Sequence, residues 1–274
     1  ASFQVAMAGW DRISQILSLN TNLAVAEHIT AEPASTAVVE FRNVHFGYTE
    51  GREILHNINL QLQKGKTYAF VGPTGGGKTT TASLIARLYD PTSGTILLNG
   101  KNLRAYQPEA LSKKLGFILQ EPFLFTGTVQ DNILYGNEQY RHYSNEQLRE
   151  VIKEAGLESL LTIFENGLLT NVSSGGESIS LGQKQLIAFV RAVLRNPDIL
   201  ILDEATANID TGTEQLLEEI LNKLPAHTTR IIIAHRLNTI RNADEIFFVN
   251  AGEITRAGSF NEAIDKLLND KRVS

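Results

Sequence analysis

The stretch Gly72-Pro73-Thr74-Gly75-Gly76-Gly77-Lys78-Thr79 is the most informative part of this sequence. It fits the pattern G-x-x-x-x-G-K-[ST], in which glycines allow the backbone to curl until successive N–H groups point at phosphate oxygens. The apolar run Tyr68–Val71 before it predicts a buried strand, and the segment after it predicts a helix ending at Asp90-Pro91. This context favours a phosphate-binding loop over a flexible glycine turn.

Apolar strands and amphipathic helices continue on both sides of this loop. From Val38 onward the sequence is strand-like, and strands are again predicted at Ile199–Leu202 and Ile231–Ala234, with a helix at Thr213–Leu224 between them. The stretch from about 129 to 195 is predicted to be mostly helical. A hairpin near 246–254 and a terminal helix at about Phe260–Leu268 complete the list of predicted elements. This order predicts an α/β fold with a mostly parallel sheet and an inserted helical lobe.

Two carboxylates, Asp203 and Glu204, follow the strand Ile199–Leu202. Burying carboxylates is costly unless they serve a metal or a reaction. With the loop upstream, we expect Asp203 to hold Mg²⁺ and Glu204 to polarise a water that attacks a γ-phosphate, although an acidic turn is the alternative. His235 follows the strand Ile231–Ala234, where the carboxyl ends of parallel strands meet. We therefore expect it to contact the γ-phosphate rather than to serve only as a structural hydrogen-bonding group.

A helix start is predicted at Ile179-Ser180-Leu181-Gly182-Gln183. Ser180-x-x-Gln183 fits a capping box, which would satisfy N–H groups at the first turn of the helix that runs to Arg195. A capped helix start that carries a glycine is also a phosphate site, so the structural and functional interpretations are compatible.

The composition excludes several other classes of function. The formal net charge is −5, so the chain gains little counterion-release affinity for DNA or RNA, and we expect no nucleic-acid partner. The sequence has no cysteine, which excludes disulfides, thiolate metal sites and cysteine nucleophiles. No apolar run approaches the roughly 20 residues of a membrane-spanning helix, and no signal peptide is visible.

An amphipathic helix is predicted at residues 1–19 and a linker at Pro33–Thr36. The apolar face of this helix comprises Phe3, Met7, Trp10, Ile13 and Leu17. Such a helix either packs on the domain or continues a helix that lies outside this sequence. The chain begins at Ala1 rather than Met, so we expect it to be a piece of a longer protein.

These motifs, in this order, resemble the nucleotide-binding domain of ABC transporters over roughly residues 38–270. The loop at 72–79 resembles the Walker A motif of that family, and Ile199–Glu204 resembles its Walker B motif with the catalytic glutamate. Ile179–Gln183 is similar to the LSGGQ signature. The other matches are the Q-loop at Gln120, the D-loop at Ala207–Asp210, the H-loop at His235 and, for the aromatic that stacks on adenine, Tyr48.

The resemblance implies an α/β fold of the P-loop NTPase (RecA-like) type, with an antiparallel β subdomain and a helical subdomain inserted at about residues 121–190. It implies an ATPase domain at 37–274, preceded at 1–36 by the tail of a transmembrane or coupling helix with its linker. The expected catalytic residues are Lys78, Gln120, Glu204 and His235, and the expected Mg²⁺ ligands are Thr79, Gln120 and Asp203. ATP would contact Tyr48, Gly72, Pro73, Thr74, Gly75, Gly76, Gly77, Lys78, Thr79, Thr80, Ser180, Gly182 and Gln183.

The resemblance also implies partners and a location. Two such domains would bind ATP head to tail as a homodimer or heterodimer and would drive transmembrane domains at the cytoplasmic face of a membrane. Phe123-Leu124-Phe125 and Trp10-Asp11-Arg12-Ile13 resemble the exporter branch, and the second match favours the interpretation of residues 1–19 as part of a longer helix.

The sequence departs from the family pattern in the signature and the D-loop. Leu181 stands where the signature has its central glycine, Ile179 where it has leucine, and Asn208-Ile209 where the D-loop has Ala-Leu. An asymmetry of this kind suits a heterodimer. Two other functions share these motifs: a soluble ABC ATPase of DNA repair or translation, and a regulatory module that holds ATP without hydrolysing it.

Overall fold

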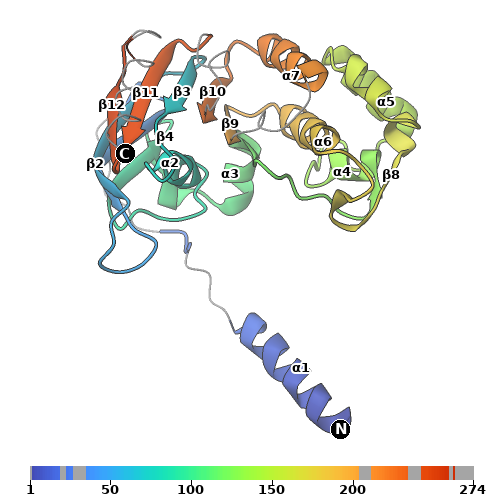
Figure 1. The fold of residues 1–274 in the computed structure, drawn as a ribbon, viewed down its shortest axis with the longest axis horizontal. Coiled ribbons are helices and arrows are strands. Elements are labelled where there is room, and N and C mark those ends of the chain that lie inside the picture. The colour runs from blue at the N-terminus through green and yellow to red at the C-terminus, as the bar shows by residue number, and fades with distance from the viewer. Residues whose placement is uncertain are drawn as a thin grey trace.

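The computed structural model describes residues 2–18, 23–26, 35–203, 211–233, 242–258 and 262. A six-stranded sheet lies at its centre, with strand order β12-β11-β3-β10-β9-β6 (Figure 1). These strands are β3 (Thr67–Val71), β6 (Leu115–Ile118), β9 (Ile199–Asp203), β10 (Thr229–Ile233), β11 (Glu245–Asn250) and β12 (Glu253–Arg256). All neighbours pair in parallel except β11 and β12, which form the predicted hairpin. The predicted α/β fold with a mostly parallel sheet is confirmed.

Parallel pairing places the ends of three strands side by side. Ile233 in β10 pairs with Phe70 in β3 and with Asp203 in β9. Residues 67–71 and 199–203 are buried along their whole length, as expected for strands covered on both faces. The loop after β3 and the carboxylate that ends β9 therefore meet at one edge of the sheet.

A second sheet is antiparallel, with order β2-β1-β4-β5. Its strands are β1 (Val39–Phe46), β2 (Leu55–Leu62), β4 (Ser93–Leu98) and β5 (Lys101–Asn102). Phe41 and Leu55 from this sheet share one hydrophobic core with Tyr68 and Phe70 of the central sheet. The antiparallel β part that the resemblance implies is thus packed directly on the phosphate-loop side of the molecule.

Helix α2 (Lys78–Ile85) begins inside the glycine-rich loop and is shorter than predicted. The chain leaves the helix because Arg87 adopts a left-handed conformation with φ of 51°. Its buried guanidinium donates to the carbonyl oxygens of Tyr106 at 2.9 Å and Ala24 at 3.0 Å. Leu88 is consequently half-exposed, so the prediction that the helix continues to Asp90 is wrong.

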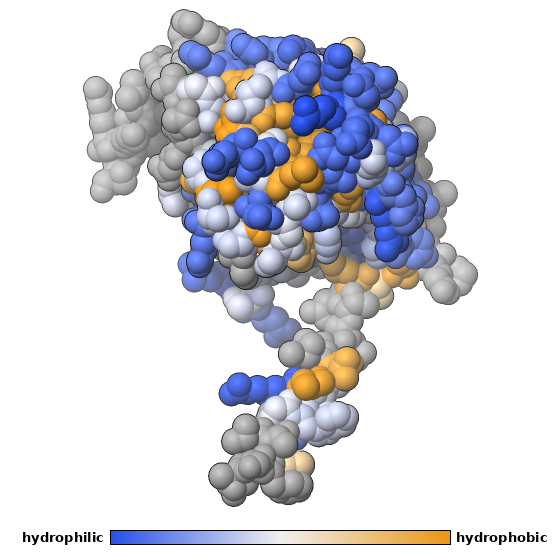
Figure 2. All heavy atoms as spheres, turned by 90° about the vertical axis from the view of Figure 1, so that its right-hand side faces the viewer, coloured by the Kyte–Doolittle hydropathy of each residue, from blue (hydrophilic) through white to orange (hydrophobic). Residues whose placement is uncertain are grey.

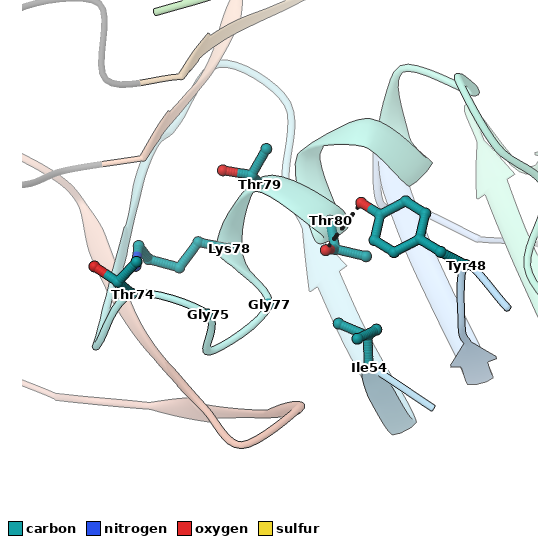
Figure 3. A pocket seen from close by; sticks show the side chains of 8 residues that line it. All are labelled: Tyr48, Ile54, Thr74, Gly75, Gly77, Lys78, Thr79 and Thr80. Atoms are coloured by element: carbon teal, nitrogen blue, oxygen red, sulfur yellow. Dashed lines mark hydrogen bonds between the residues drawn. The ribbon is translucent and has the colours of Figure 1, made fainter. Parts of the chain in front are cut away.

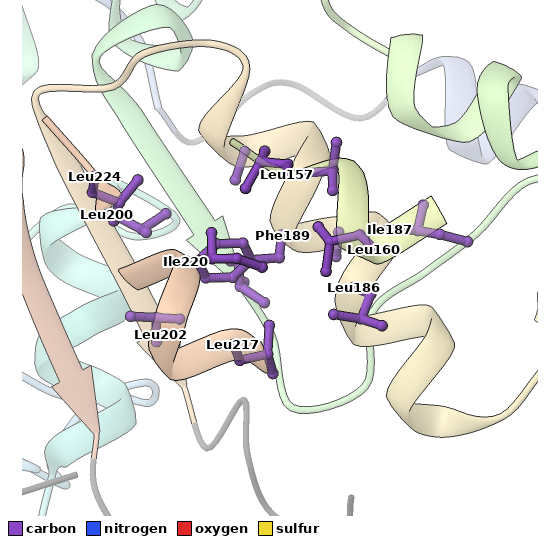
Figure 4. Close-up of a cluster of buried hydrophobic side chains, with 14 of the residues drawn as sticks. Leu157, Leu160, Leu186, Ile187, Phe189, Leu200, Leu202, Leu217, Ile220 and Leu224 are labelled. Carbon is purple, nitrogen blue, oxygen red and sulfur yellow. The ribbon is translucent and has the colours of Figure 1, made fainter. Parts of the chain in front are cut away.

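Helices also cover the side of the molecule opposite the antiparallel sheet (Figure 1). They are α4 (Val129–Leu134), α5 (Asn145–Glu154), α6 (Leu181–Val193) and α7 (Thr211–Lys223), whereas α3 (Pro108–Lys114) places Leu111 in the core shared with the antiparallel sheet. Figure 4 shows Phe189 of α6 among Leu200, Leu202 and side chains of α7, within a second hydrophobic core. Burial of these side chains stabilises the contact between α6 and the central sheet by roughly 1.5–3 kcal/mol for each large apolar group.

The stretch at 129–195 is less helical than predicted. Between α5 and α6 it holds three short 3-10 helices, Glu158–Ile163, Gly167–Leu169 and Ser174–Gly176. It also holds β8 (Asn171–Val172), which pairs with β7 (Gly127–Thr128). Glycines with positive φ interrupt the helical pattern here, and Gly175 at φ of 66° is one of them.

Helix α1 (Ser2–Leu17) projects away from the rest of the molecule (Figure 1). Met7, Trp10, Ile13 and Leu17 are exposed, so this apolar face does not pack on the domain. The next described residues, 23–26, do contact the domain, because Ala26 N–H donates to the carbonyl of Arg104 at 3.0 Å. Among the described helices, none has the length and apolar character needed to cross a bilayer. The predicted terminal helix at Phe260–Leu268 lies outside the described residues, apart from Glu262.

Glu40 of β1 makes hydrogen bonds within the antiparallel sheet whose contribution to stability depends on pH. Hydrogen bonds from Arg42 at 2.9 and 3.0 Å, with a further one from Gln61 at 3.1 Å, lower the pKa of this carboxyl from 4.5 to about 2. A carboxyl with a lower pKa in the folded than in the unfolded chain stabilises the fold above its unfolded pKa. That contribution is lost as the pH falls towards the folded pKa.

We therefore expect Glu40→Gln to lower the free energy of unfolding at pH 7. The difference from wild type should shrink as the pH falls from about 4.5 to about 2. Urea unfolding at a series of pH values measures this. Glu109→Gln, on an exposed site of α3, controls for the loss of one negative charge. A difference that is constant from pH 7 to pH 2 would contradict the assignment.

Candidate active site

The glycine-rich loop has a backbone shape that only glycine can take at its first position. Gly72 has φ of 144°, and a Cβ there would clash with the carbonyl oxygen of Val249 at the end of β11. The loop is closed by a hydrogen bond from Gly76 N–H to Pro73 O at 3.1 Å, and the β11-β12 turn supports it through Gly252 N–H to Gly76 O at 3.1 Å. The loop conformation is therefore imposed by neighbouring backbone as well as by its own glycines.

Lys78 is the first residue of α2 and is almost fully buried. Its Nζ donates to the carbonyl oxygens of Gly72 and Pro73, each at 2.9 Å. In Figure 3 its side chain runs back along the loop towards Thr74. The ammonium group thus lies at the concave side of the loop, where it would neutralise a bound phosphate.

A hollow of about 250 Å³ opens beside this loop. It is lined by Tyr48, Ile54, Thr74, Gly75, Gly77, Lys78, Thr79 and Thr80. The loop residues make one end polar, whereas Ile54 and the half-exposed ring of Tyr48 make the other end apolar and aromatic (Figure 3). A phosphorylated ligand with a flat apolar group would match both ends.

The ring of Tyr48 is held from three sides. Its hydroxyl lies 3.2 Å from Oγ1 of Thr80 on α2. Phe46 and Tyr89 contact it edge-on, with ring centroids 4.9 and 5.0 Å away. These protein contacts fix the orientation of the ring, which would reduce the entropy lost if a planar group stacked on it.

At the sheet edge, Thr79 and Asp203 are in contact. Thr79 Oγ1 donates to Asp203 Oδ1 at 3.2 Å, although 124 positions separate the two residues. A hydroxyl beside a carboxylate is the oxygen donor set that suits Mg²⁺. No group of three or more His, Cys, Asp or Glu side chains within the described ranges is arranged to hold a metal. Glu204 and His235, which follow β9 and β10, lie outside the described residues.

Gln120 lies two residues beyond the end of β6 and is exposed. It does not line the hollow, and its backbone carbonyl accepts a hydrogen bond from Gln185 of α6. Its predicted role at the metal stays a prediction.

The predicted capping box at the start of α6 is confirmed. Ser180 Oγ accepts from the N–H of Gln183 at 3.2 Å, and Gln183 Oε1 accepts from the N–H of Ser180 at 2.9 Å. Neither these two residues nor Gly182 lines the hollow. Their predicted contact with ATP requires a ligand held elsewhere and stays a prediction. Ala207–Asp210, the predicted D-loop, lie outside the described residues.

Two residues of this region were missed by sequence reasoning. Ile54 lines the hollow but belongs to no motif, and an isolated apolar residue before a strand carries no distinguishing signal. Tyr89 falls in the segment predicted to be helical up to Asp90-Pro91, but it lies beyond the end of α2, is half-exposed and supports Tyr48. Both contacts depend on the way the antiparallel sheet packs beside α2.

A family model described as ABC transporter matches residues 55–207, which is more than half of the chain. The chain belongs to the ABC transporter family. An uncharacterised ABC transporter ATP-binding protein of Bacillus subtilis is 41% identical over 259 residues, covering 94% of this chain and 42% of the relative. A fatty acid ABC transporter ATP-binding/permease protein of Mycobacterium bovis is 39% identical over 232 residues, covering 85% of this chain and 36% of the relative.

The fold comparison leads to the same family of transporters. The structure of a bacterial Atm1-family ABC exporter with ATP bound matches with a TM-score of 0.79 and 33% identity, over 97% of this chain and 46% of the exporter chain. The resemblance to an ABC ATPase domain and the P-loop NTPase fold are confirmed, and membership of this ATP-binding family implies ATP as the nucleotide. The Mycobacterium relative is named as a transporter and the structural match as an exporter. The chain spans less than half of the length of each of these relatives.

Two glycines of the loop give a matched test of its backbone. Gly72 and Gly75 both have positive φ, 144° and 80°, but a Cβ at Gly75 would meet nothing within 4 Å. We expect Gly75→Ala to cost about 1 kcal/mol of unfolding free energy through backbone strain alone. Gly72→Ala should cost at least about 2 kcal/mol more, because the backbone at Val249 must move. Urea unfolding of both variants measures this, and equal losses would show that the Val249 contact does not constrain the loop.

Proposed function

We propose that this chain binds ATP with Mg²⁺ and hydrolyses it to power an ABC exporter. The observation that carries the proposal is the hydrogen bond between Thr79 and Asp203. Thr79 follows Lys78, whose ammonium donates to a carbonyl of the glycine-rich loop. The Asp203 carboxylate meets the Thr79 hydroxyl, and Thr79 lines the same hollow of nucleotide-compatible character as Lys78. This is the combination that transfer of a γ-phosphoryl group to water requires.

Each residue has a distinct task in this proposal. The N–H groups of the loop 72–80 and the ammonium of Lys78 neutralise phosphate charge. Thr79, Asp203 and Gln120 are the residues that would hold Mg²⁺, which supplies positive charge at the β- and γ-phosphates. Glu204 accepts the proton of the attacking water, and His235 donates to the γ-phosphate. The ring of Tyr48 stacks on the adenine, while the three supporting contacts keep it in place.

The start of α6 suggests that a second domain takes part. Ser180, Gly182 and Gln183 lie away from the hollow of their own chain, and Ser180 is exposed. We propose that they contact ATP held mainly by the P-loop of a partner domain, in a head-to-tail homodimer or heterodimer. Leu181 would lie at that contact, where its side chain distinguishes this half-site from one built with glycine.

The apolar surface of the helical part suggests a further partner. Figure 2 views the side where α5 and β8 lie in Figure 1 and shows apolar patches among hydrophilic ones. Exposed apolar side chains of the helical part include Phe123, Tyr135 and Leu169. We propose that a helical subdomain at about 121–190 meets the transmembrane domains at the cytoplasmic face of a membrane. In this arrangement residues 1–36 connect the transmembrane domains to the ATPase domain, which comprises residues 37–274.

The test of hydrolysis is Glu204→Gln, which keeps the shape of the side chain but removes the base. The variant should bind ATP as wild type does, release phosphate at least about 100-fold more slowly, and accumulate an ATP-bound dimer. Phosphate release is measured at high protein concentration, so that dimers form, and size-exclusion chromatography measures association. Turnover at the wild-type rate would remove Glu204 as the base. Absence of turnover in wild type would instead favour a regulatory module that holds ATP without hydrolysing it.

The role of Tyr48 is tested by measuring the affinity of Tyr48 variants for ATP. Stacking of a base on an aromatic ring contributes about 1–3 kcal/mol, so Tyr48→Ala should weaken ATP binding by about 5- to 150-fold. Tyr48→Phe keeps the ring and loses only the hydroxyl contact with Thr80, so it should retain most of the affinity. Isothermal titration calorimetry compares the three proteins. An unchanged dissociation constant in Tyr48→Ala would rule out stacking.

A further inference from the structure

Gln185 of α6 forms hydrogen bonds with the segment after β6, which contains Gln120. Its side chain is 1% exposed. Its Nε2 donates to the carbonyl oxygen of Leu119 at 3.3 Å and to that of Gln120. The donor therefore reaches across 65 positions of sequence to the residue proposed above as a Mg²⁺ ligand.

The two accepting carbonyls have a specific geometric meaning. The carbonyl of Leu119 belongs to the peptide plane before the Cα of Gln120, and the carbonyl of Gln120 belongs to the plane after it. Peptide planes are rigid, so the two dihedral angles at Gln120 are its only soft backbone coordinates. A donor that holds both carbonyls fixes both planes, and it thereby fixes the direction in which the Gln120 side chain leaves the backbone.

The acceptor end of the amide is unpaired among the described residues. Gln185 Oε1 is buried, and no donor reaches it within the described part of the chain. The side chain is thus held through its donor alone. An apolar residue of similar size would remove the hydrogen bonds and the unsatisfied acceptor together, so the gain from the second change offsets part of the loss from the first. Leu119 and Gln120 are both exposed, so water can satisfy their carbonyls after such a substitution.

Gln185 also shares a rigid element with the signature. Helix α6 begins at its cap residue Ser180 and runs without interruption through Gln185. Gln183, one of the cap residues, is itself tied to the carbonyl of Ile163 at 3.1 Å. A displacement of the start of α6 would therefore carry Gln185, and with it the backbone of Gln120.

We propose that Gln185 is a positioning residue of the ATP site, which sets the orientation of the Gln120 side chain towards Mg²⁺ and couples that orientation to the position of the signature helix. The inference rests on the proposed role of Gln120 as a metal ligand. It assigns to a buried glutamine a task that a purely structural side chain would not have.

The test is Gln185→Leu in the full 274-residue chain, with phosphate release measured as a function of Mg²⁺ concentration at saturating ATP. Loss of a residue that orients a metal ligand typically weakens metal affinity by about 10- to 100-fold. We expect the Mg²⁺ concentration for half-maximal turnover to rise by about tenfold. The affinity for ATP without Mg²⁺ and the urea midpoint of unfolding should stay close to the wild-type values.

Gln130→Leu is the matched control. Gln130 also donates its side-chain amide to a backbone carbonyl, that of Tyr143 at 3.1 Å, but the bond does not involve Gln120. Its Mg²⁺ profile should match wild type. If Gln185→Leu does not fold, Gln185→Met replaces it, because methionine fills the same length with a flexible apolar chain.

Two results would overturn the proposal. One is a Mg²⁺ profile of a folded Gln185 variant that matches wild type, and the other is an equal shift in Gln130→Leu. Either result leaves the proposed hydrolysis intact, since wild-type turnover and the Glu204→Gln variant test that function separately.

Discussion

The parallel ladder through β3, β10 and β9 is the constraint on which the site depends. Alternate residues of these strands enter different cores: Tyr68 and Phe70 face the core shared with the antiparallel sheet, whereas Ala69 and Val71 face the core under the helices. A shift of β3 by one residue would exchange Tyr68 and Phe70 for Ala69 and Val71 on the two faces, so the register of β3 is strongly specified. Because that register is specified, the loop after β3 and Asp203 at the end of β9 meet, and Thr79 reaches the carboxylate at 3.2 Å.

The phosphate loop is supported from outside as well as by its own residues. Two residues of the β11-β12 hairpin contact it. The carbonyl oxygen of Val249 occupies the space that a Cβ at Gly72 would need, and Gly252 N–H donates to the carbonyl of Gly76. Neighbouring backbone therefore holds the loop in shape, so little reorganisation is needed for it to bind phosphate. Lys78 already lies on the inner side, bonded to two loop carbonyls that a phosphate would replace as its partners.

The hollow is shared between two sheets. The loop belongs to the parallel sheet, whereas Tyr48 and Ile54 lie between β1 and β2 of the antiparallel sheet. The two sheets are held against each other by a common core that includes Phe41, Leu55, Tyr68 and Phe70. The start of α6 lies apart from this hollow, which agrees with the proposal that its residues act on the nucleotide of another domain. The hydrogen bond from Gln185 to the carbonyl of Gln120 then links that helix to Gln120.

Short-range patterns in the sequence determined the strand–loop–helix unit, the carboxylate at the end of β9 and the capping box at Ser180. Each of these depends on backbone geometry and on residues within a few positions of one another, so local chemistry is sufficient to predict it. Tertiary structure alone decided that α2 ends at Ile85, because the left-handed Arg87 is held by carbonyls of distant segments. It also decided the support of Tyr48 by Tyr89 and the link from Gln185 to Gln120. The last two contacts join residues 41 and 65 positions apart, and only the packing of sheets and helices brings such residues together.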